Sequence, residues 1–193
     1  GIWGVIYIGL LLYAIYQALP NRRDDGRLGP FGGLFVSNCL LNAAWLFAWH
    51  YQYPALTMLL WFCLLATLVL VYRELGEWGE PSLLVRIPFT LYLAWISVAT
   101  LANASALQTS LDLNDAGLNH VQWTLVKIAL AGAVGASVCL LKRDAVFVLV
   151  VAWAAFGIAS KQVAVPEVQG AALTVSALAV MLAVFTLVRL RRS

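Results

Sequence analysis

Seven long apolar runs, separated only by short polar turns, constrain this chain most. Only 11% of its residues are charged, whereas a soluble domain has about a quarter. Most of the runs approach the ~20 residues with which an α-helix crosses a bilayer. The sequence therefore predicts an all-α fold, a polytopic transmembrane helix bundle with about seven membrane-spanning helices. The runs cover approximately residues 2–19, 31–50, 55–72, 84–107, 121–141, 145–160 and 170–190.

The basic residues lie on alternate sides of these runs. Of the twelve Lys and Arg residues, all but Lys127 and Lys161 fall in or beside every second connection, or at and after the end of the last run. Cytoplasmic loops carry such an excess of positive charge. We therefore expect an integral membrane protein of the bacterial inner (plasma) membrane, with its C-terminus in the cytoplasm. A further helix upstream of Gly1 would make eight crossings. The alternating residues are Arg22, Arg23, Arg27, Arg73, Arg86, Lys142, Arg143, Arg189, Arg191 and Arg192.

No connection is long enough to separate independent domains, so the sequence predicts a single membrane domain. Residues 116–193 nevertheless differ from residues 1–115, because their helices are rich in Ala, Val and Gly and poor in aromatic residues. The pairs Ala131/Gly135 and Gly132/Ala136 place small residues four positions apart, a spacing that permits close approach of neighbouring helices. These pairs predict packing rather than a specific dimer, and they leave a homodimer open as an alternative.

Catalytic signatures are absent from the sequence. There is no phosphate-binding glycine loop, no zinc-protease motif and no nucleophile–base set. The cysteines Cys39, Cys63 and Cys139 lie inside apolar runs, where small buried side chains explain them. No Asp or Glu lies within a run, which argues against a proton- or sodium-coupled transporter. We expect no enzyme activity, no metal site, no required cofactor and no nucleic-acid partner.

Lys127 is the one charged residue well inside an apolar run, since Arg86 and Arg189 lie at the ends of theirs. Its long side chain could extend to the membrane surface, or its ammonium group could attract an anionic ligand within the membrane. The sequence leaves both interpretations open.

Two stripes of amide and indole side chains are the strongest candidates for a binding site. In one stripe Trp95, Ala99 and Asn103 have the spacing i, i+4 and i+8. In the other, Asn38, Asn42, Trp45 and Trp49 have the spacing i, i+4, i+7 and i+11, and thus share one helix face. An amide facing lipid would lack a hydrogen-bond partner, so this face must contact protein or a cavity. Aromatic walls can stack on a flat ligand while a few polar groups orient it, although packing alone could also explain these rings. The candidate ligand-binding residues are Trp3, Tyr7, Asn38, Asn42, Trp45, Tyr92, Trp95, Ala99 and Asn103.

Three segments resemble motifs of the tryptophan-rich sensory protein, or translocator protein (TspO/MBR), family. Residues 1–7, GIWGVIY, resemble its FgxxWtxxY motif; residues 42–49, NAAWLFAW, resemble NxxWsxxFF; and residues 92–103, YLAWISVATLAN, resemble PYLxWxxfAxxLN. The resemblance covers about residues 1–115. The family's first helix would lie upstream of Gly1, and Leu91 stands where the family has a proline, so the chain resembles an extended relative.

The resemblance implies a helical core whose aromatic pocket binds a porphyrin or another tetrapyrrole, including a heme-type ligand. It places Trp3, Tyr7, Asn42, Trp45, Trp95, Ala99 and Asn103 in or near that pocket. The leading hypothesis is a sensor or carrier of such a hydrophobic small molecule in the lipid bilayer. The alternatives are a small-molecule transporter that uses the C-terminal helices and a non-catalytic membrane scaffold.

Overall fold

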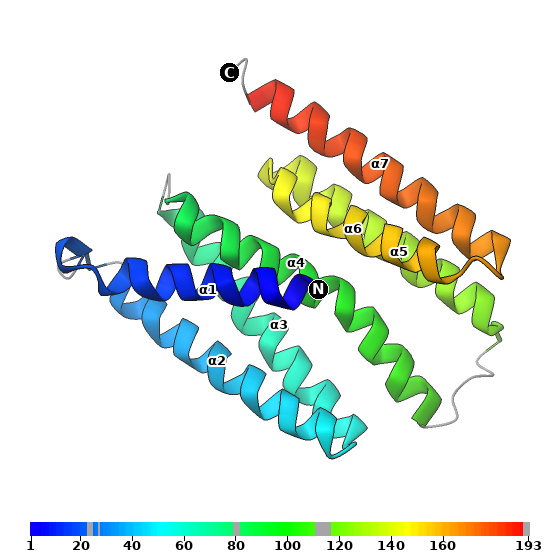
Figure 1. Cartoon of the computed structure of the whole chain (residues 1–193), viewed down its shortest axis with the longest axis horizontal. Helices are drawn as coiled ribbons and strands as arrows, with labels where there is room; N and C mark the ends of the chain where they lie inside the picture. Colours follow the sequence, from blue (N-terminus) through cyan, green and yellow to red (C-terminus); the bar gives the residue numbers. More distant parts are fainter. Residues whose placement is uncertain (23–24, 27, 79–81, 111–116, 191–193) are drawn as a thin grey trace. The chain divides into compact units, whose positions relative to one another are not determined.

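The computed structural model describes residues 1–22, 25–26, 28–78, 82–110 and 117–190, and these residues form seven α-helices and one 3-10 turn without a strand (Figure 1). The all-α prediction is therefore confirmed. Of the basic residues used for the orientation, Arg23, Arg27, Arg191 and Arg192 lie outside the described residues. The elements are α1 (Ile2–Ala18), η1 (Pro20–Arg22), α2 (Leu28–His50), α3 (Pro54–Glu77), α4 (Leu83–Ser110), α5 (His120–Lys142), α6 (Ala145–Lys161) and α7 (Pro166–Leu190).

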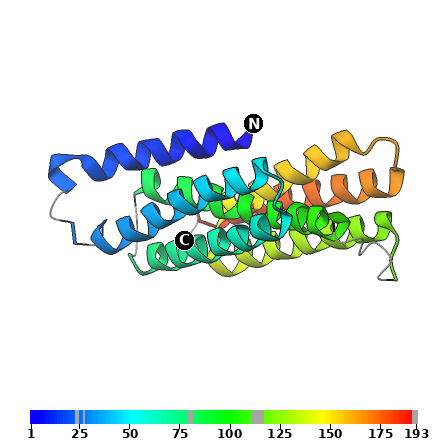
Figure 2. The same cartoon turned by 90° about the horizontal axis from the view of Figure 1, so that it is seen from below.

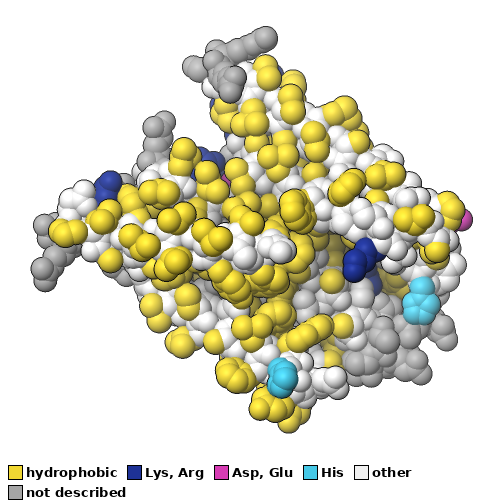
Figure 3. Space-filling model, in the orientation of Figure 1, with side chains coloured by type: hydrophobic (Ala, Val, Ile, Leu, Met, Phe, Trp, Pro, Cys, Tyr) yellow, Lys and Arg dark blue, Asp and Glu magenta, His cyan; other side chains and the backbone are white. Residues whose placement is uncertain are grey.

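The helices have the length and surface of membrane-spanning segments. Among the described residues, α2, α3, α4, α5 and α7 are long and apolar enough to cross a bilayer. The other two, α1 and α6, are apolar but have 17 residues each, at the lower end of the range that spans a membrane. Hydrophobic side chains cover much of the face seen in Figure 3. The chain is thus a helical membrane bundle, as the sequence predicts.

Two helix boundaries differ most from the sequence-based expectation. Residues 73–77, expected in a charged loop, form the last turn of α3, because the change from apolar to charged side chains does not interrupt a backbone helix. In the same way, α7 begins at Pro166 rather than near Gly170. Proline suits the first turn of a helix, because a backbone N–H at that position would have no intrahelical acceptor and its absence costs no hydrogen bond.

The chain divides into two compact units, residues 1–96 and 97–193, with the boundary inside α4. In the first unit α2 packs along α3, and α1 approaches α4 closely at one position. A Cβ atom added to Gly9 would lie 3.0 Å from the Cβ atom of Pro88. The ring of Tyr13 contacts those of Phe31 and Phe89, each with centroids 5.0–5.5 Å away. The close approach at Gly9 and the ring contacts of Tyr13 thus position α1.

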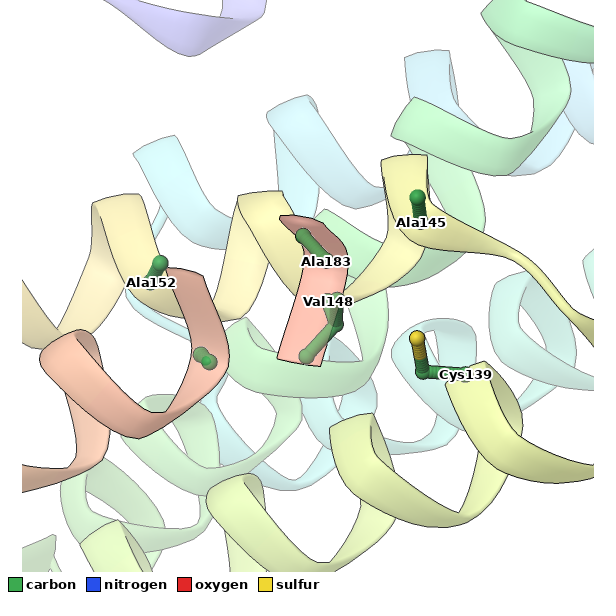
Figure 4. Close-up of a cluster of buried hydrophobic side chains, with 6 residues drawn as sticks. Cys139, Ala145, Val148, Ala152 and Ala183 are labelled. Atoms are coloured by element: carbon green, nitrogen blue, oxygen red, sulfur yellow. The ribbon is translucent and has the colours of Figure 1, made fainter. Parts of the chain in front are cut away.

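In the second unit α5, α6 and α7 pack against one another, and Figures 1 and 2 show them side by side. A Cβ atom on Gly135 would lie 2.9 Å from Cγ2 of Val151 in α6, and one on Gly132 would lie 3.2 Å from Cγ1 of Val175 in α7. The predicted close packing at these glycines is therefore confirmed. Figure 4 shows the small side chains of the core, a cluster formed by Cys139, Ala145, Val148, Ala152, Ala179 and Ala183.

Candidate functional site

The amide and indole stripe of α2 faces protein over most of its length. Asn38, Asn42 and Trp45 retain 2%, 7% and 9% of their accessible surface, as expected for polar groups in an apolar helix. Trp49 is instead 52% exposed. It lies in the last turn of α2, where its ring is 6.1 Å from that of Trp45. The stripe is therefore buried at its first three positions only.

Asn42 connects three helices through its side-chain amide. The hydroxyl of Tyr7 in α1 donates a hydrogen bond to Asn42 Oδ1 at 3.5 Å. Asn42 Nδ2 in turn donates to the hydroxyl oxygen of Tyr92 in α4. A buried amide without partners would be costly, and these two tyrosines supply them. All three residues belong to the predicted binding set and to the first unit.

Asn38 makes its hydrogen bonds to a different helix, α3. Its Nδ2 donates to Thr67 Oγ1 at 2.9 Å and lies 3.5 Å from the carbonyl oxygen of Leu64. The Thr67 hydroxyl donates to that same carbonyl oxygen at 2.9 Å. The amide nitrogen of Asn38 therefore joins α2 to α3. The sequence analysis did not identify Thr67, since a single threonine in an apolar run is no signal by itself.

Trp3 is the centre of an aromatic group in the first unit. Its ring stacks on Tyr7 and Trp45, with centroids 5.5 and 5.8 Å away. The edges of Tyr92 and Trp95 meet it at 6.0 and 6.5 Å. These distances are typical of favourable ring pairs. The structure thus brings together the aromatic side chains that the sequence motifs placed in one pocket.

The indole N–H groups in this region differ in their hydrogen bonding. Trp61 packs its ring 4.7 Å from that of Trp45 and donates its N–H to the carbonyl oxygen of Ile96 at 3.3 Å. The N–H groups of Trp45 and Trp95 are buried and find no acceptor within the described part of the chain. Buried indole donors usually have a partner.

An open cleft of about 380 Å³ lies beside this network, between α1 and α2. Tyr7, Asn42 and Tyr92 contribute its hydrogen-bonding groups together with Asn38, and the other walls are mainly aliphatic. Trp3 contacts Tyr7 and Tyr92, and Trp45 and Trp95 contact Trp3. None of the three tryptophans lines the cleft. The lining residues are Tyr7, Leu10, Leu11, Ala14, Phe35, Asn38, Cys39, Asn42, Leu46 and Tyr92.

The cysteines differ from one another more than the sequence suggests. Cys39 is exposed and lines the cleft, Cys63 is half-buried, and Cys139 is buried. The expectation of three buried side chains is therefore confirmed for Cys139, met only in part for Cys63 and wrong for Cys39. It occupies the α2 position after Asn38, and this turn of the helix faces the cleft.

Ala99 and Asn103 follow Trp95 by about one and two turns of α4 and belong to the second unit. Asn103 Nδ2 donates to the carbonyl oxygen of Ala99 at 3.0 Å, so the side chain returns to its own helix. Its Oδ1 atom is buried without a donor among the described residues.

Lys127 also makes its polar contacts inside the second unit. Its Nζ lies 2.5 Å from Ser105 Oγ and 3.3 Å from Gln108 Oε1, both in α4. The ammonium group also lies 5.9 Å from the centre of the Trp123 ring. The side chain therefore joins α5 to α4 through these hydrogen bonds.

Comparison with known proteins identifies one family. A family model described as TSPO-like protein matches residues 1–188. The match extends beyond residue 115, where the three sequence motifs end, to the last turns of α7. No curated protein and no solved structure matches the chain significantly.

Proposed function

The chain belongs to the TSPO-like protein family, and from this membership and the geometry of the cleft we propose that it binds a flat hydrophobic ligand of the porphyrin or tetrapyrrole class. In this proposal the protein is a non-catalytic sensor or carrier in the membrane. The observation that carries the proposal is the hydrogen-bonded chain Tyr7–Asn42–Tyr92 in the wall of a cleft whose other side chains are mainly apolar.

The composition of the cleft suits such a ligand. Small-molecule sites are concave, of about 300–1,000 Å³, mostly apolar and equipped with a few fixed polar groups. Leu10, Leu46 and Phe35 offer apolar and aromatic surface to a conjugated ring. A network of one amide and two phenols can orient polar substituents at the ring's edge.

Tyr7 is the residue best placed to donate to the ligand. Its side chain is 44% exposed, and its hydroxyl lies 3.5 Å from Asn42 Oδ1. That separation is at the long end for an O–H···O hydrogen bond. A carboxylate on the ligand could therefore accept this proton in a shorter, charge-assisted bond in place of the long bond to Asn42.

The direct test is a tryptophan-fluorescence titration of the detergent-purified protein with protoporphyrin IX. Saturable quenching is expected, and Tyr92→Phe and Asn42→Leu should weaken the affinity about 3- to 10-fold, the loss of about one hydrogen bond. Tyr13→Phe is the matched control, because Tyr13 is a buried tyrosine of the same unit that does not line the cleft. Linear quenching in every variant would indicate partitioning into the micelle and contradict the proposal.

A second experiment locates the ligand through Cys39. In a Cys63→Ala/Cys139→Ala variant, Cys39 is the remaining thiol, and bound protoporphyrin IX should slow its modification by a membrane-permeable maleimide. The matched variant Cys39→Ala/Cys139→Ala retains Cys63, which does not line the cleft, and its labelling should be unchanged. Equal protection of both thiols would place the ligand elsewhere.

One observation favours transport as a second candidate function. Lys127 carries a positive charge within a candidate membrane span, and its bonded partners Ser105 and Gln108 are neutral. An anionic substrate could interact with this ammonium group along a path through the C-terminal helices. Flux of such a substrate into proteoliposomes should fall in Lys127→Met and persist in Lys142→Met. Absence of both flux and saturable binding would favour a membrane scaffold.

A further inference from the structure

A second cleft, of about 470 Å³, lies in the second unit where α5 and α7 end. Two arginines line it: Arg143, the C-cap residue of α5, and Arg189, in the last turn of α7. The TspO-like motifs identified above do not include this region. Both helices are long and apolar enough to cross a bilayer, so the cleft lies at the membrane-surface end of two candidate spans.

The two guanidinium groups are available to an anion. Within the described part of the chain neither forms an ion pair. The neighbouring acid, Asp144, is 3% exposed and does not line the cleft; its Oδ1 accepts the backbone N–H of Phe147 at 3.1 Å and caps α6. The Arg189 guanidinium lies 5.1 Å from the centre of the Phe185 ring, a contact that favours a fixed guanidinium plane.

Apart from the two arginines, the lining of the cleft is mainly apolar. Leu140 and Phe185 line it and are 61% and 52% exposed. The polar atoms of Cys139 and Thr186, which also line it, lie 3.2 Å apart and hydrogen-bond to each other. These two groups therefore do not require a polar ligand. The cleft combines a cationic end with an apolar body.

We propose that this cleft binds an anionic phospholipid, with the head-group phosphate between Arg143 and Arg189 and an acyl chain along Leu140 and Phe185. Guanidinium groups bind phosphate oxygens with bidentate, charge-assisted hydrogen bonds. Basic pockets between transmembrane helices are suited to anionic head groups. The lipid would join α5 to α7 and stabilise the C-terminal helices.

The arginines have a competing structural explanation. The carboxyl ends of α5 and α7 carry partial negative charge, and cationic side chains are favourable there without any ligand. On that explanation, removal of either arginine lowers stability but leaves lipid binding unchanged. The conformation of Arg143, with φ 52° and ψ 36°, allows a clean test, because glycine adopts this left-handed region readily.

The test measures the retention of phosphatidylglycerol by native mass spectrometry, and the thermal midpoint with each lipid, on the detergent-purified full chain. Wild type should retain one phosphatidylglycerol, and its midpoint should rise. Phosphatidylcholine and inorganic phosphate at matched concentration should have little effect. An equal shift with inorganic phosphate would identify a soluble-anion site and overturn the lipid proposal.

The variants are Arg143→Gly and Arg189→Gln, with Lys142→Gln as the matched control. Lys142 has the same charge and adjoins Arg143 but does not line the cleft. Each arginine variant should weaken phosphatidylglycerol binding about tenfold, whereas Lys142→Gln should bind as wild type. Equal weakening in all three would indicate general surface charge. Unchanged binding in both arginine variants, including the backbone-compatible Arg143→Gly, would overturn the proposal.

Discussion

At the scale of single residues, the hydrogen-bond partner of each buried polar group determines its role. Asn38 and Asn42 are one turn apart on α2 and equally typical of a binding stripe. Asn42 bonds to Tyr7 and Tyr92 beside the cleft, whereas Asn38 bonds to Thr67 and helps to hold α2 on α3. Because burial without a partner is costly, each amide constrains the helices around it.

Two tyrosines of the first unit should respond differently to loss of the hydroxyl. Tyr92→Phe leaves Asn42 Nδ2 without its acceptor and should lower the free energy of unfolding by about 1–2 kcal/mol. Tyr13 OH is buried without a partner among the described residues, so Tyr13→Phe should leave stability unchanged or raise it by up to ~1 kcal/mol. Unfolding in mixed micelles, followed by circular dichroism, measures both. A larger loss in Tyr13→Phe would show that its hydroxyl is bonded.

At the scale of helices, close approach depends on small residues at a few positions. α1 meets α4 at Gly9 and Pro88, whereas α5 meets α6 at Gly135 and Val151. In a membrane, helices associate through packing and hydrogen bonds rather than through release of water from apolar surface. The loss of one close contact should therefore have a measurable effect.

Gly9→Val should displace α1, because its Cβ would lie 3.0 Å from the Cβ atom of the rigid Pro88 ring. Such overpacking typically costs about 1–3 kcal/mol. The displacement should also separate Tyr7 from Asn42 and weaken protoporphyrin IX quenching. Gly4→Val is the control, since a Cβ atom at Gly4 meets nothing within 4 Å. Wild-type affinity and stability in Gly9→Val would contradict this account.

Gly135→Ala should destabilise the second unit by about 1–3 kcal/mol. The added methyl group would lie 2.9 Å from Cγ2 of Val151, and a β-branched side chain in a helix has little rotamer freedom to move away. In Gly157→Ala the methyl group meets nothing within 4 Å, and helix propensity favours alanine by up to about 1 kcal/mol. Opposite shifts of the unfolding midpoint are expected, and equal shifts would refute the packing argument.

At the scale of the whole molecule, the chain is a helical membrane protein of the TSPO-like family with two compact units that share α4. The proposed porphyrin site lies in the first unit and the proposed lipid site in the second.

The orientation in the membrane follows from the distribution of basic residues and remains a prediction. Green fluorescent protein fused after Ser193 should fluoresce in bacterial cells, whereas alkaline phosphatase at the same point should be inactive, because cytoplasmic segments carry the positive charge. The reverse pattern would place the C-terminus outside and require a different number of crossings or a different orientation.

The sequence by itself determined the class of protein and the number and approximate ends of its helices. Runs of apolar residues need a helix to satisfy their backbone groups in lipid, and this requirement is local. The same local periodicity predicted that Asn38, Asn42 and Trp45 face protein, and it identified the glycines of α5 as packing positions.

Only the tertiary structure decided which groups meet across helices. The periodicity of one helix defines a face but neither the partner of that face nor the rotation of the partner. For this reason Thr67 was missed as the partner of Asn38, and Cys39 was expected to be buried although it lines the cleft. The arginines at the ends of α5 and α7 likewise share a cleft across 46 residues of sequence, because the packing of α5 against α7 brings the two helix ends together.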